Sequence, residues 1–279
     1  MMKIAVASGK GGTGKTTIAV SLALSLGDVQ YLDCDVEEPN GHLFLKPQIK
    51  ETISVGIPVP EIDTSRCTYC GLCAKVCVYH ALVVIKDMVL TFPELCHGCG
   101  ACSSLCPENA IVENDRTIGV IEKGIARDLE FIHARLNIGE PMAPPLIRKE
   151  KQYLNDHKTA LLDCPPGTSC PVVQSAIGSD FCLLVTEPTP FGLHDLKLAV
   201  EMVRALKIPC GVVINMADVG TRETWDFCRQ EHLPILMEIP FDRRIAESYA
   251  RGIPLVDAFP EYRDRFCRLY QAIAEWRRS

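Results

Sequence analysis

The sequence predicts an α/β fold in which a mostly parallel sheet carries helices on both faces and is interrupted by a small α+β insert. Three observations predict it. Short apolar runs alternate with helical stretches, a glycine-rich loop follows the first apolar run, and two cysteine runs of identical spacing lie between the second and third apolar runs. The expected organisation is a main domain in two parts, residues 1–60 and 116–279, around an insert at residues 61–115.

Composition and charge narrow the class of protein. The chain has 279 residues, of which 47% are hydrophobic and 23% charged, and this is enough for one large core and a small satellite. A net charge of −6 gives no basic footprint, so we expect no nucleic-acid partner. The chain lacks an uninterrupted stretch of eighteen apolar residues, which argues against a membrane-spanning helix. The many thiols favour a reducing cytoplasm over a disulfide framework.

The first strand leads directly into a phosphate-binding loop. Lys3–Ala7 is a short apolar run, and Ile18–Leu26 after the loop is apolar on nearly all sides. Strand, glycine loop and buried helix is the context that a P-loop requires, against the alternative of a glycine-rich turn without a ligand. We expect Lys15 to reach the β- and γ-phosphates of ATP and the Thr16 hydroxyl to bind Mg²⁺. The predicted nucleotide-binding residues of the loop are Gly11, Gly12, Thr13, Gly14, Lys15, Thr16 and Thr17.

An additional lysine in this loop, Lys10, indicates a family. The sequence Gly-Lys-Gly-Gly-Thr-Gly-Lys-Thr-Thr resembles the deviant Walker A motif of the MinD/ParA/Mrp and nitrogenase iron protein group of P-loop ATPases. The resemblance implies a homodimer with ATP sandwiched between the subunits. It also implies that Lys10 acts on the partner's nucleotide, where it would neutralise charge on the transferred phosphoryl group.

Two further segments resemble the switches of this family. Val29–Asp33 is a strand-like run that leads into the acidic segment Asp33–Asn40, and Thr159–Leu162 leads into Asp163. By the resemblance, Asp35 positions the attacking water and Asp163 holds Mg²⁺ through water, while Asp33 has a structural or outer-sphere role. An aspartate after a strand can also be a plain cap or turn residue, but three such signals in order favour the functional interpretation.

The insert carries eight cysteines in two runs of the pattern C-x2-C-x2-C-x3-C. This spacing is that of bacterial ferredoxins, in which the fourth thiolate of each run binds the other cluster. It predicts two [4Fe–4S] clusters, cluster I with Cys67, Cys70, Cys73 and Cys106, and cluster II with Cys96, Cys99, Cys102 and Cys77. Four-cysteine zinc sites are the alternative, but they usually use two C-x2-C pairs with a longer spacer.

Prolines mark the expected entry to the insert, and the rest of the chain returns to the sheet. Pro47, Pro58 and Pro60 precede the first cysteine run, and residues 117–148 are expected to rejoin the main domain without an assigned role. Further strands are expected at Asp180–Thr186 and Cys210–Asn215. Helices are expected at Gly192–Leu206, Arg222–Glu231, Arg243–Arg251 and Glu261–Trp276.

Two downstream positions give weaker signals. Asn215, at a strand end, resembles the adenine-reading position of the family, although asparagine there is as often a turn residue. Pro240 lies in a segment that resembles the one packing against the base. Three cysteines near the switches, Cys34, Cys164 and Cys170, could contribute to a metal site that bridges two subunits.

The combined motifs imply an ATP-hydrolysing iron–sulfur protein. We expect ATP-driven dimer closure to be coupled to electron transfer or to metal-cluster assembly on an acceptor protein. The alternative is a MinD/ParA-like positioning or partitioning ATPase that acts on membrane or DNA. Acidic charge and the ordinary apolar stripe of the last helix make membrane binding the less favoured reading.

Overall fold

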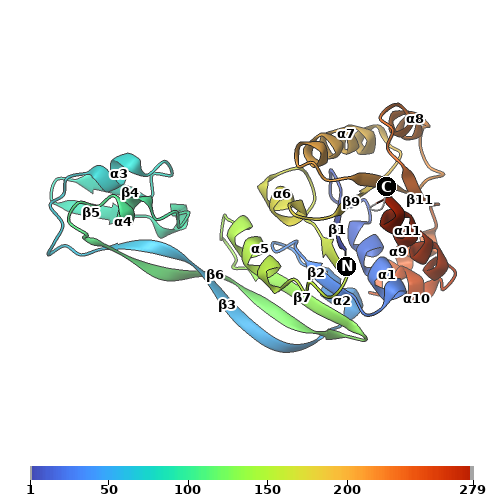
Figure 1. Cartoon of the computed structure of the whole chain (residues 1–279), viewed down its shortest axis with the longest axis horizontal. Coiled ribbons are helices and arrows are strands. Elements are labelled where there is room, and N and C mark those ends of the chain that lie inside the picture. Colours follow the sequence, from blue (N-terminus) through green and yellow to red (C-terminus); the bar gives the residue numbers. More distant parts are fainter. Residues whose placement is uncertain (1, 277–279) are drawn as a thin grey trace. The chain divides into compact units, whose positions relative to one another are not determined.

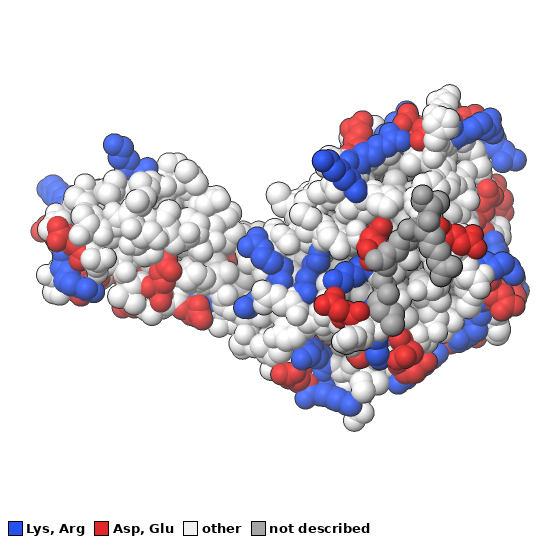
Figure 2. Space-filling view, viewed as in Figure 1, with Lys and Arg blue, Asp and Glu red and all other residues white. Residues whose placement is uncertain are grey.

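The computed structural model describes residues 2–276, which form two compact units (Figure 1). Unit 1 contains the residues up to Thr52, Ile121–Arg135 and the residues from Ile147 onward. Unit 2 contains Ile53–Val120 and Leu136–Leu146. No helix within residues 2–276 is long and apolar enough to cross a membrane. On the visible face of unit 1, basic and acidic side chains are interspersed (Figure 2).

The main sheet has the order β11-β10-β9-β1-β8-β2-β7-β6-β3. Pairing is parallel from β11 through to β7, which confirms the predicted mostly parallel sheet. The two-residue connection between β6 and β7 makes that pair an antiparallel hairpin. The strands are β1 (Lys3–Ala7), β2 (Gln30–Asp33), β3 (Gln48–Ile62), β6 (Ile111–Ala126), β7 (Leu129–Leu136), β8 (Ala160–Asp163), β9 (Phe181–Thr186), β10 (Cys210–Asn215) and β11 (Ile235–Ile239).

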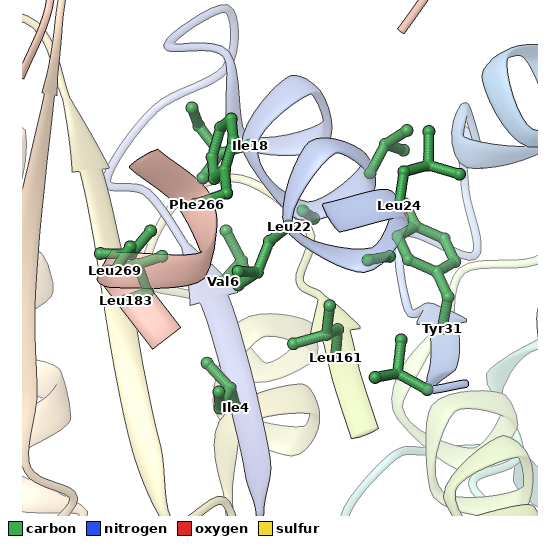
Figure 3. Packing of buried hydrophobic residues seen from close by; sticks show 14 of the residues in the cluster. Ile4, Val6, Ile18, Leu22, Leu24, Tyr31, Leu161, Leu183, Phe266 and Leu269 are labelled. Carbon is green, nitrogen blue, oxygen red and sulfur yellow. The ribbon is translucent and has the colours of Figure 1, made fainter. Parts of the chain in front are cut away.

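Helices cover both faces of this sheet because its strands are apolar on both sides. In β1, Ile4 and Val6 join one core while Ala5 and Ala7 join the other. Figure 3 shows the first core, where β1 packs against α1 and α11. The helices of unit 1 and its border are α1 (Lys15–Leu26), α2 (Gly41–Leu45), α5 (Pro144–Glu150), α6 (Cys170–Ala176), α7 (Pro190–Ala205), α8 (Glu223–Gln230), α9 (Arg243–Ala250), α10 (Leu255–Ala258) and α11 (Tyr262–Trp276), with a 3-10 turn at Lys151–Tyr153.

The last helix packs on the protein, as its apolar spacing predicts. Tyr262, Phe266, Leu269 and Ile273 are all buried in the first core, beside α1. Burial of each such side chain contributes on the order of 2 kcal/mol to the free energy of unfolding. The apolar stripe is therefore used within the subunit.

Unit 2 contains a small α+β arrangement around the cysteine runs. Its elements are α3 (Leu72–Val76), β4 (Leu82–Ile85), β5 (Met88–Thr91), a 3-10 turn at Pro93–Leu95 and α4 (Ala101–Ser104). β4 and β5 form a separate two-stranded antiparallel sheet.

Two of the prolines that mark the expected entry to the insert lie within a strand. Pro58 and Pro60 both lie inside β3, a strand of fifteen residues. β3 is the last strand in the sheet order, and an edge strand tolerates a residue without an N–H group because one of its sides needs no ladder bonds. β6 is similarly long and continues from Ile111 to Ala126.

Candidate functional site

The glycine-rich loop lies between β1 and α1, at the carboxyl end of a central parallel strand. Gly12 and Gly14 have φ values of 82° and 92°, a region that side chains with a Cβ atom rarely adopt. Gly14 precedes α1, and no side chain caps that helix end. The buried hydroxyl of Thr13 also has no hydrogen-bond partner within the described part of the chain. Free donors at a helix N-terminus suit the phosphates of a nucleotide.

The predicted Mg²⁺ ligands lie together beneath this loop. Asp163, at the end of β8, is fully buried, and its Oδ1 lies 3.9 Å from the Nζ atom of Lys15. Burial raises the pKa of Asp163, while the Lys15 ammonium and the Thr16 hydroxyl lower it. Tyr31 donates a hydrogen bond of 2.9 Å to the other carboxylate oxygen. A hydroxyl and a carboxylate side by side are oxygen ligands of the kind that Mg²⁺ takes, so these residues fit the ion.

Asp33 and Asp35 occupy different environments although they are two residues apart. Asp33 is paired directly with Asp163 in the parallel register of β2 and β8, and its carboxylate accepts hydrogen bonds from the backbone N–H groups of Gly41 (2.7 Å) and Asp35 (3.3 Å). These bonds hold the segment after β2, which is a structural role. Asp35 is half-buried, and its carboxylate accepts a hydrogen bond from the backbone N–H of Glu38. Burial raises the pKa of the Asp35 carboxyl to about 6, while the charge of the nearby Lys15 ammonium lowers it.

Lys10 is held inside its own subunit. Its ammonium forms an ion pair with Glu187, which directly follows β9. The Thr189 hydroxyl donates to the same Glu187 oxygen at 3.2 Å and accepts from the backbone N–H of Gly192, so it also caps α7. An action of Lys10 on a second subunit would require this pair to separate.

Asn215 contacts the P-loop itself. Its side-chain amide donates a hydrogen bond of 2.9 Å to the Thr13 carbonyl and accepts one of 3.1 Å from the Met216 N–H. Pro240 follows β11 and lines a pocket together with Asp218, Arg222 and other residues of the segment 217–225. Asn215 and this pocket both adjoin the carboxyl ends of β10 and β11, where open α/β sheets bind their ligands.

Four thiols of unit 2 surround one cavity. Cys67, Cys70 and Cys73 of the first run line it together with Cys106 of the second run. Val84 and Val89 of the β4–β5 hairpin close the cavity on an apolar side. Burial raises the pKa of the Cys73 thiol, and the nearby Cys67 and Cys70 thiols raise it further. The set of thiols lining the cavity is the one predicted for cluster I.

The remaining four thiols form the corresponding group. Burial raises the pKa of Cys96, and both Cys99 and Cys77 raise it further through their proximity. Burial likewise raises the pKa of Cys102 to about 11, with an added contribution from Cys96. Cys77 thus lies near Cys96 of the second run, with which it is expected to share cluster II. Within residues 2–276, no group of three or more His, Cys, Asp or Glu side chains is arranged so that it could hold a single metal ion.

The two cysteine runs have the same local geometry, each position of the second lying 29 residues after its counterpart. The Sγ atom of the first cysteine in each run accepts a hydrogen bond of 3.4 Å from the backbone N–H of the residue two positions later in the chain. The Sγ atom of the fourth cysteine accepts one of 3.3 Å from the backbone N–H of the residue four positions later. The paired residues Gly71 and Gly100 have φ values of 78° and 72° and immediately precede α3 and α4. N–H bonds to sulfur stabilise thiolates, so this backbone fits iron–sulfur ligation.

The cysteines near the switches do not form a shared surface site. Cys34 and Cys164 are completely buried, and burial raises the pKa of Cys164 to about 12. Of the three, only Cys170, the first residue of α6, is exposed. A thiol enclosed in the core cannot bridge two subunits unless the core opens.

Three residues of the site were missed by sequence reasoning. Tyr31 reaches Asp163 from inside β2, and nothing in an apolar strand signals that contact. Glu187 could have been found, because it follows β9 just as the switch aspartates follow β2 and β8. Glu150 is fully buried at the end of α5, and burial raises its pKa well above the ordinary value.

Comparisons with known proteins agree with this geometry. The model of the CobQ/CobB/MinD/ParA nucleotide binding domain matches residues 4–255. A Methanocaldococcus jannaschii protein, named as uncharacterized protein MJ0579, is 32% identical, with 99% of this chain and 97% of that protein covered. A Pyrococcus horikoshii protein named as an iron-sulfur cluster carrier protein is 27% identical, over 91% of this chain and 79% of its own length.

Solved structures resemble the fold. The cell division ATPase MinD of Pyrococcus furiosus aligns with a TM-score of 0.59 at 22% identity, covering 99% of both chains. The septum site-determining protein MinD of Pyrococcus horikoshii, solved with Mg-ADP, aligns with a TM-score of 0.58 at 20% identity, covering 98% of this chain and 95% of that one. Because the family model matches residues 4–255, which is most of its length, the chain belongs to the CobQ/CobB/MinD/ParA family of nucleotide-binding P-loop ATPases.

Proposed function

We propose that this chain is an ATP-hydrolysing iron–sulfur protein that delivers electrons to an acceptor protein under nucleotide control. Two four-iron clusters bound in unit 2 would supply the redox chemistry. The observation that carries the proposal is the cavity lined by Cys67, Cys70, Cys73 and Cys106. A cysteine from the second run joins three from the first, which is the crossed arrangement typical of two-cluster ferredoxins.

The nucleotide site supports the ATPase half of the proposal. The P-loop amides and Lys15 would bind the phosphates, and Thr16 and Asp163 would hold Mg²⁺. Asp35 would orient the attacking water. Lys10 would leave Glu187 and reach the nucleotide of a second subunit when the dimer closes. The chain passes from the segment after Asp35 through α2 and β3 into unit 2, so a movement of that segment has a continuous covalent route to the clusters.

Electron delivery is favoured over cluster carriage by the placement of the thiols. A carried cluster must be released, which needs exposed, convergent thiols outside the resident sites. Three cysteines near the expected switches lie outside the two runs. Of these, Cys34 and Cys164 are buried, and only Cys170 is exposed. Several relatives are nevertheless named as iron-sulfur cluster carrier proteins, which makes cluster carriage the second candidate function.

A double-substitution experiment tests the crossed ligation. Anaerobically purified protein should contain about eight iron atoms per chain, and Cys67→Ala should lower this to about four. Cys67→Ala combined with Cys106→Ala should still leave about four, because both residues serve one cluster. Cys67→Ala combined with Cys77→Ala should leave almost none. The reverse pattern would show that each run holds its own metal site, and zinc in place of iron would remove the redox proposal.

The coupling is tested by redox titration in three nucleotide states. The reduction potential of the clusters should differ between the empty protein, the ADP complex and the complex with a non-hydrolysable ATP analogue. Lys15→Ala should lose the difference while keeping its iron, and the exposed Lys149→Ala should behave as the wild type. Identical potentials in all three states would refute the coupling. Transfer of iron from the protein to an apo acceptor would instead establish carriage.

A further inference from the structure

The β4–β5 hairpin of unit 2 has two apolar faces with different surroundings. Its strands pair in antiparallel register, so residues directly opposite each other lie on the same face. Val84 pairs with Val89, and both line the cavity of the cluster I thiols. The alternate positions must then lie on the opposite face of the hairpin.

That outer face is apolar and exposed. It consists of two cross-strand pairs, Val83 with Leu90 and Ile85 with Met88. Their relative exposures are 36%, 37%, 50% and 52% in that order. Together they present roughly 300 Å² of contiguous apolar surface, which is the size of patch that is often functional on a monomer.

The outer face carries no charge of its own. Across residues 81–93 the only charged side chains are Lys86 and Asp87, which are adjacent in the turn and of opposite sign. Much of the visible surface of unit 2 likewise shows neither basic nor acidic side chains (Figure 2). A partner attracted to this face must therefore present a complementary uncharged surface.

We infer that the outer face of the β4–β5 hairpin is the docking surface for a redox-partner protein that associates transiently through an apolar contact. The area decides against a second copy of this chain, since a stable dimer buries roughly 800 Å² on each partner. A contact of less than half that size falls in the class of weak electron-transfer encounters.

The position of the face explains why the partner would be a redox protein. Only the thickness of one two-stranded sheet separates the outer face from the cavity of Cys67, Cys70, Cys73 and Cys106, and packed sheet layers are about 10 Å apart. A redox centre seated here would be close to cluster I. The inference rests on the proposed function, because it requires an electron-carrying cluster in that cavity.

A photo-crosslinking experiment tests the docking surface on the full-length, cluster-loaded protein. A benzophenone side chain replaces Met88, and the protein is irradiated in anaerobic extract of its source cells. The crosslinked protein is identified by mass spectrometry and purified. Its reduction by the dithionite-reduced wild type is then followed by stopped-flow absorbance, beside that of Ile85→Lys, Met88→Lys and the matched control Ile138→Lys. Ile138 is fully exposed elsewhere in unit 2.

The expected result is a crosslinked protein that carries a redox centre and accepts electrons. Lysine at position 85 or 88 should slow its second-order reduction about tenfold or more, because a charge would enter an apolar contact. Ile138→Lys should leave the rate unchanged, and raising the salt concentration should have little effect on it. Iron content and reduction of methyl viologen, which needs no docking, should be the same in all four proteins.

Other outcomes overturn the inference. Crosslinking to a second copy of this chain, to a protein without a redox centre or to nothing would show that the face does not dock a redox partner. Equal reduction rates for the lysine variants and the wild type would have the same meaning. Absence of iron from the wild-type protein would instead refute the proposed function, and with it the inference that depends on it.

Discussion

Replacing Asp35 by asparagine should stabilise the empty protein at neutral and alkaline pH. The pKa of Asp35 is raised by burial to about 6, against an ordinary value of 3.8. The folded protein therefore binds this proton more tightly than the unfolded chain does. The carboxyl contributes to the free energy of unfolding below pH 4 and loses that contribution as the pH rises through 6.

The size of the effect follows from the shift. Two pKa units correspond to about 3 kcal/mol, and partial exposure of the side chain reduces this to about 1–2 kcal/mol. At pH 8 the Asp35→Asn variant should therefore melt about 2–8 °C above the wild type, since it removes a carboxylate whose burial is unfavourable. At pH 5 the difference should shrink, because the wild-type carboxyl is then mostly protonated.

Differential scanning calorimetry of the nucleotide-free, cluster-loaded protein at pH 5 and pH 8 measures both values. Asp87→Asn, a like change in the exposed turn of the hairpin, should leave the melting temperature unchanged. An Asp35→Asn variant that is less stable than the wild type at pH 8, or equally shifted at both pH values, would refute the reasoning. ATP turnover should fall by about a hundredfold or more in the same variant, because Asp35 is the residue proposed to position the attacking water.

Three further predictions concern single contacts. Tyr31→Phe leaves an oxygen of buried Asp163 without its donor, so the free energy of unfolding should fall by about 1–3 kcal/mol, and an unchanged urea midpoint would contradict this. Glu187→Gln weakens the ion pair that holds Lys10, so ATP-dependent dimers should form at about fivefold lower protein concentration in size-exclusion chromatography, and weaker dimerisation would argue against a restraining pair. Gly98→Ala places a Cβ atom 3.1 Å from a proline ring of β3 at a φ of 62°, so iron should fall from about eight to about four per chain, and full iron content would contradict the required geometry.

The motifs could be predicted from the sequence because their geometry is local. The P-loop needs its glycines within a few residues of each other, and the structure gives Gly12 and Gly14 the left-handed conformation that other residues avoid. The spacing of the two cysteine runs alone predicts that Cys77 and Cys106 cross between the groups, and Cys106 lies with Cys67, Cys70 and Cys73 around one cavity.

The buried parallel strands β1, β2, β8, β9 and β10 could be predicted for a similar reason. A buried parallel strand is a continuous apolar run, and its carboxyl end is marked by the polar residue that follows it. The sequence did not predict β3, because its residues Pro58 and Pro60 were expected only to mark the entry to the insert. Whether proline ends a strand depends on which neighbours the strand has, and the sequence does not state that β3 lies at an edge.

By itself, then, the sequence determined the nucleotide loop and the parallel strands at Lys3–Ala7, Phe181–Thr186 and Cys210–Asn215, and it predicted a grouping of the eight cysteines. Only the tertiary structure decided that Tyr31 donates to Asp163, that Glu187 holds Lys10 and that the hairpin covers a cysteine cavity with one face and exposes the other. These contacts join residues that are far apart in the chain, up to 177 positions for the Lys10–Glu187 pair. Their existence depends on strand order and register, which no short stretch of sequence encodes.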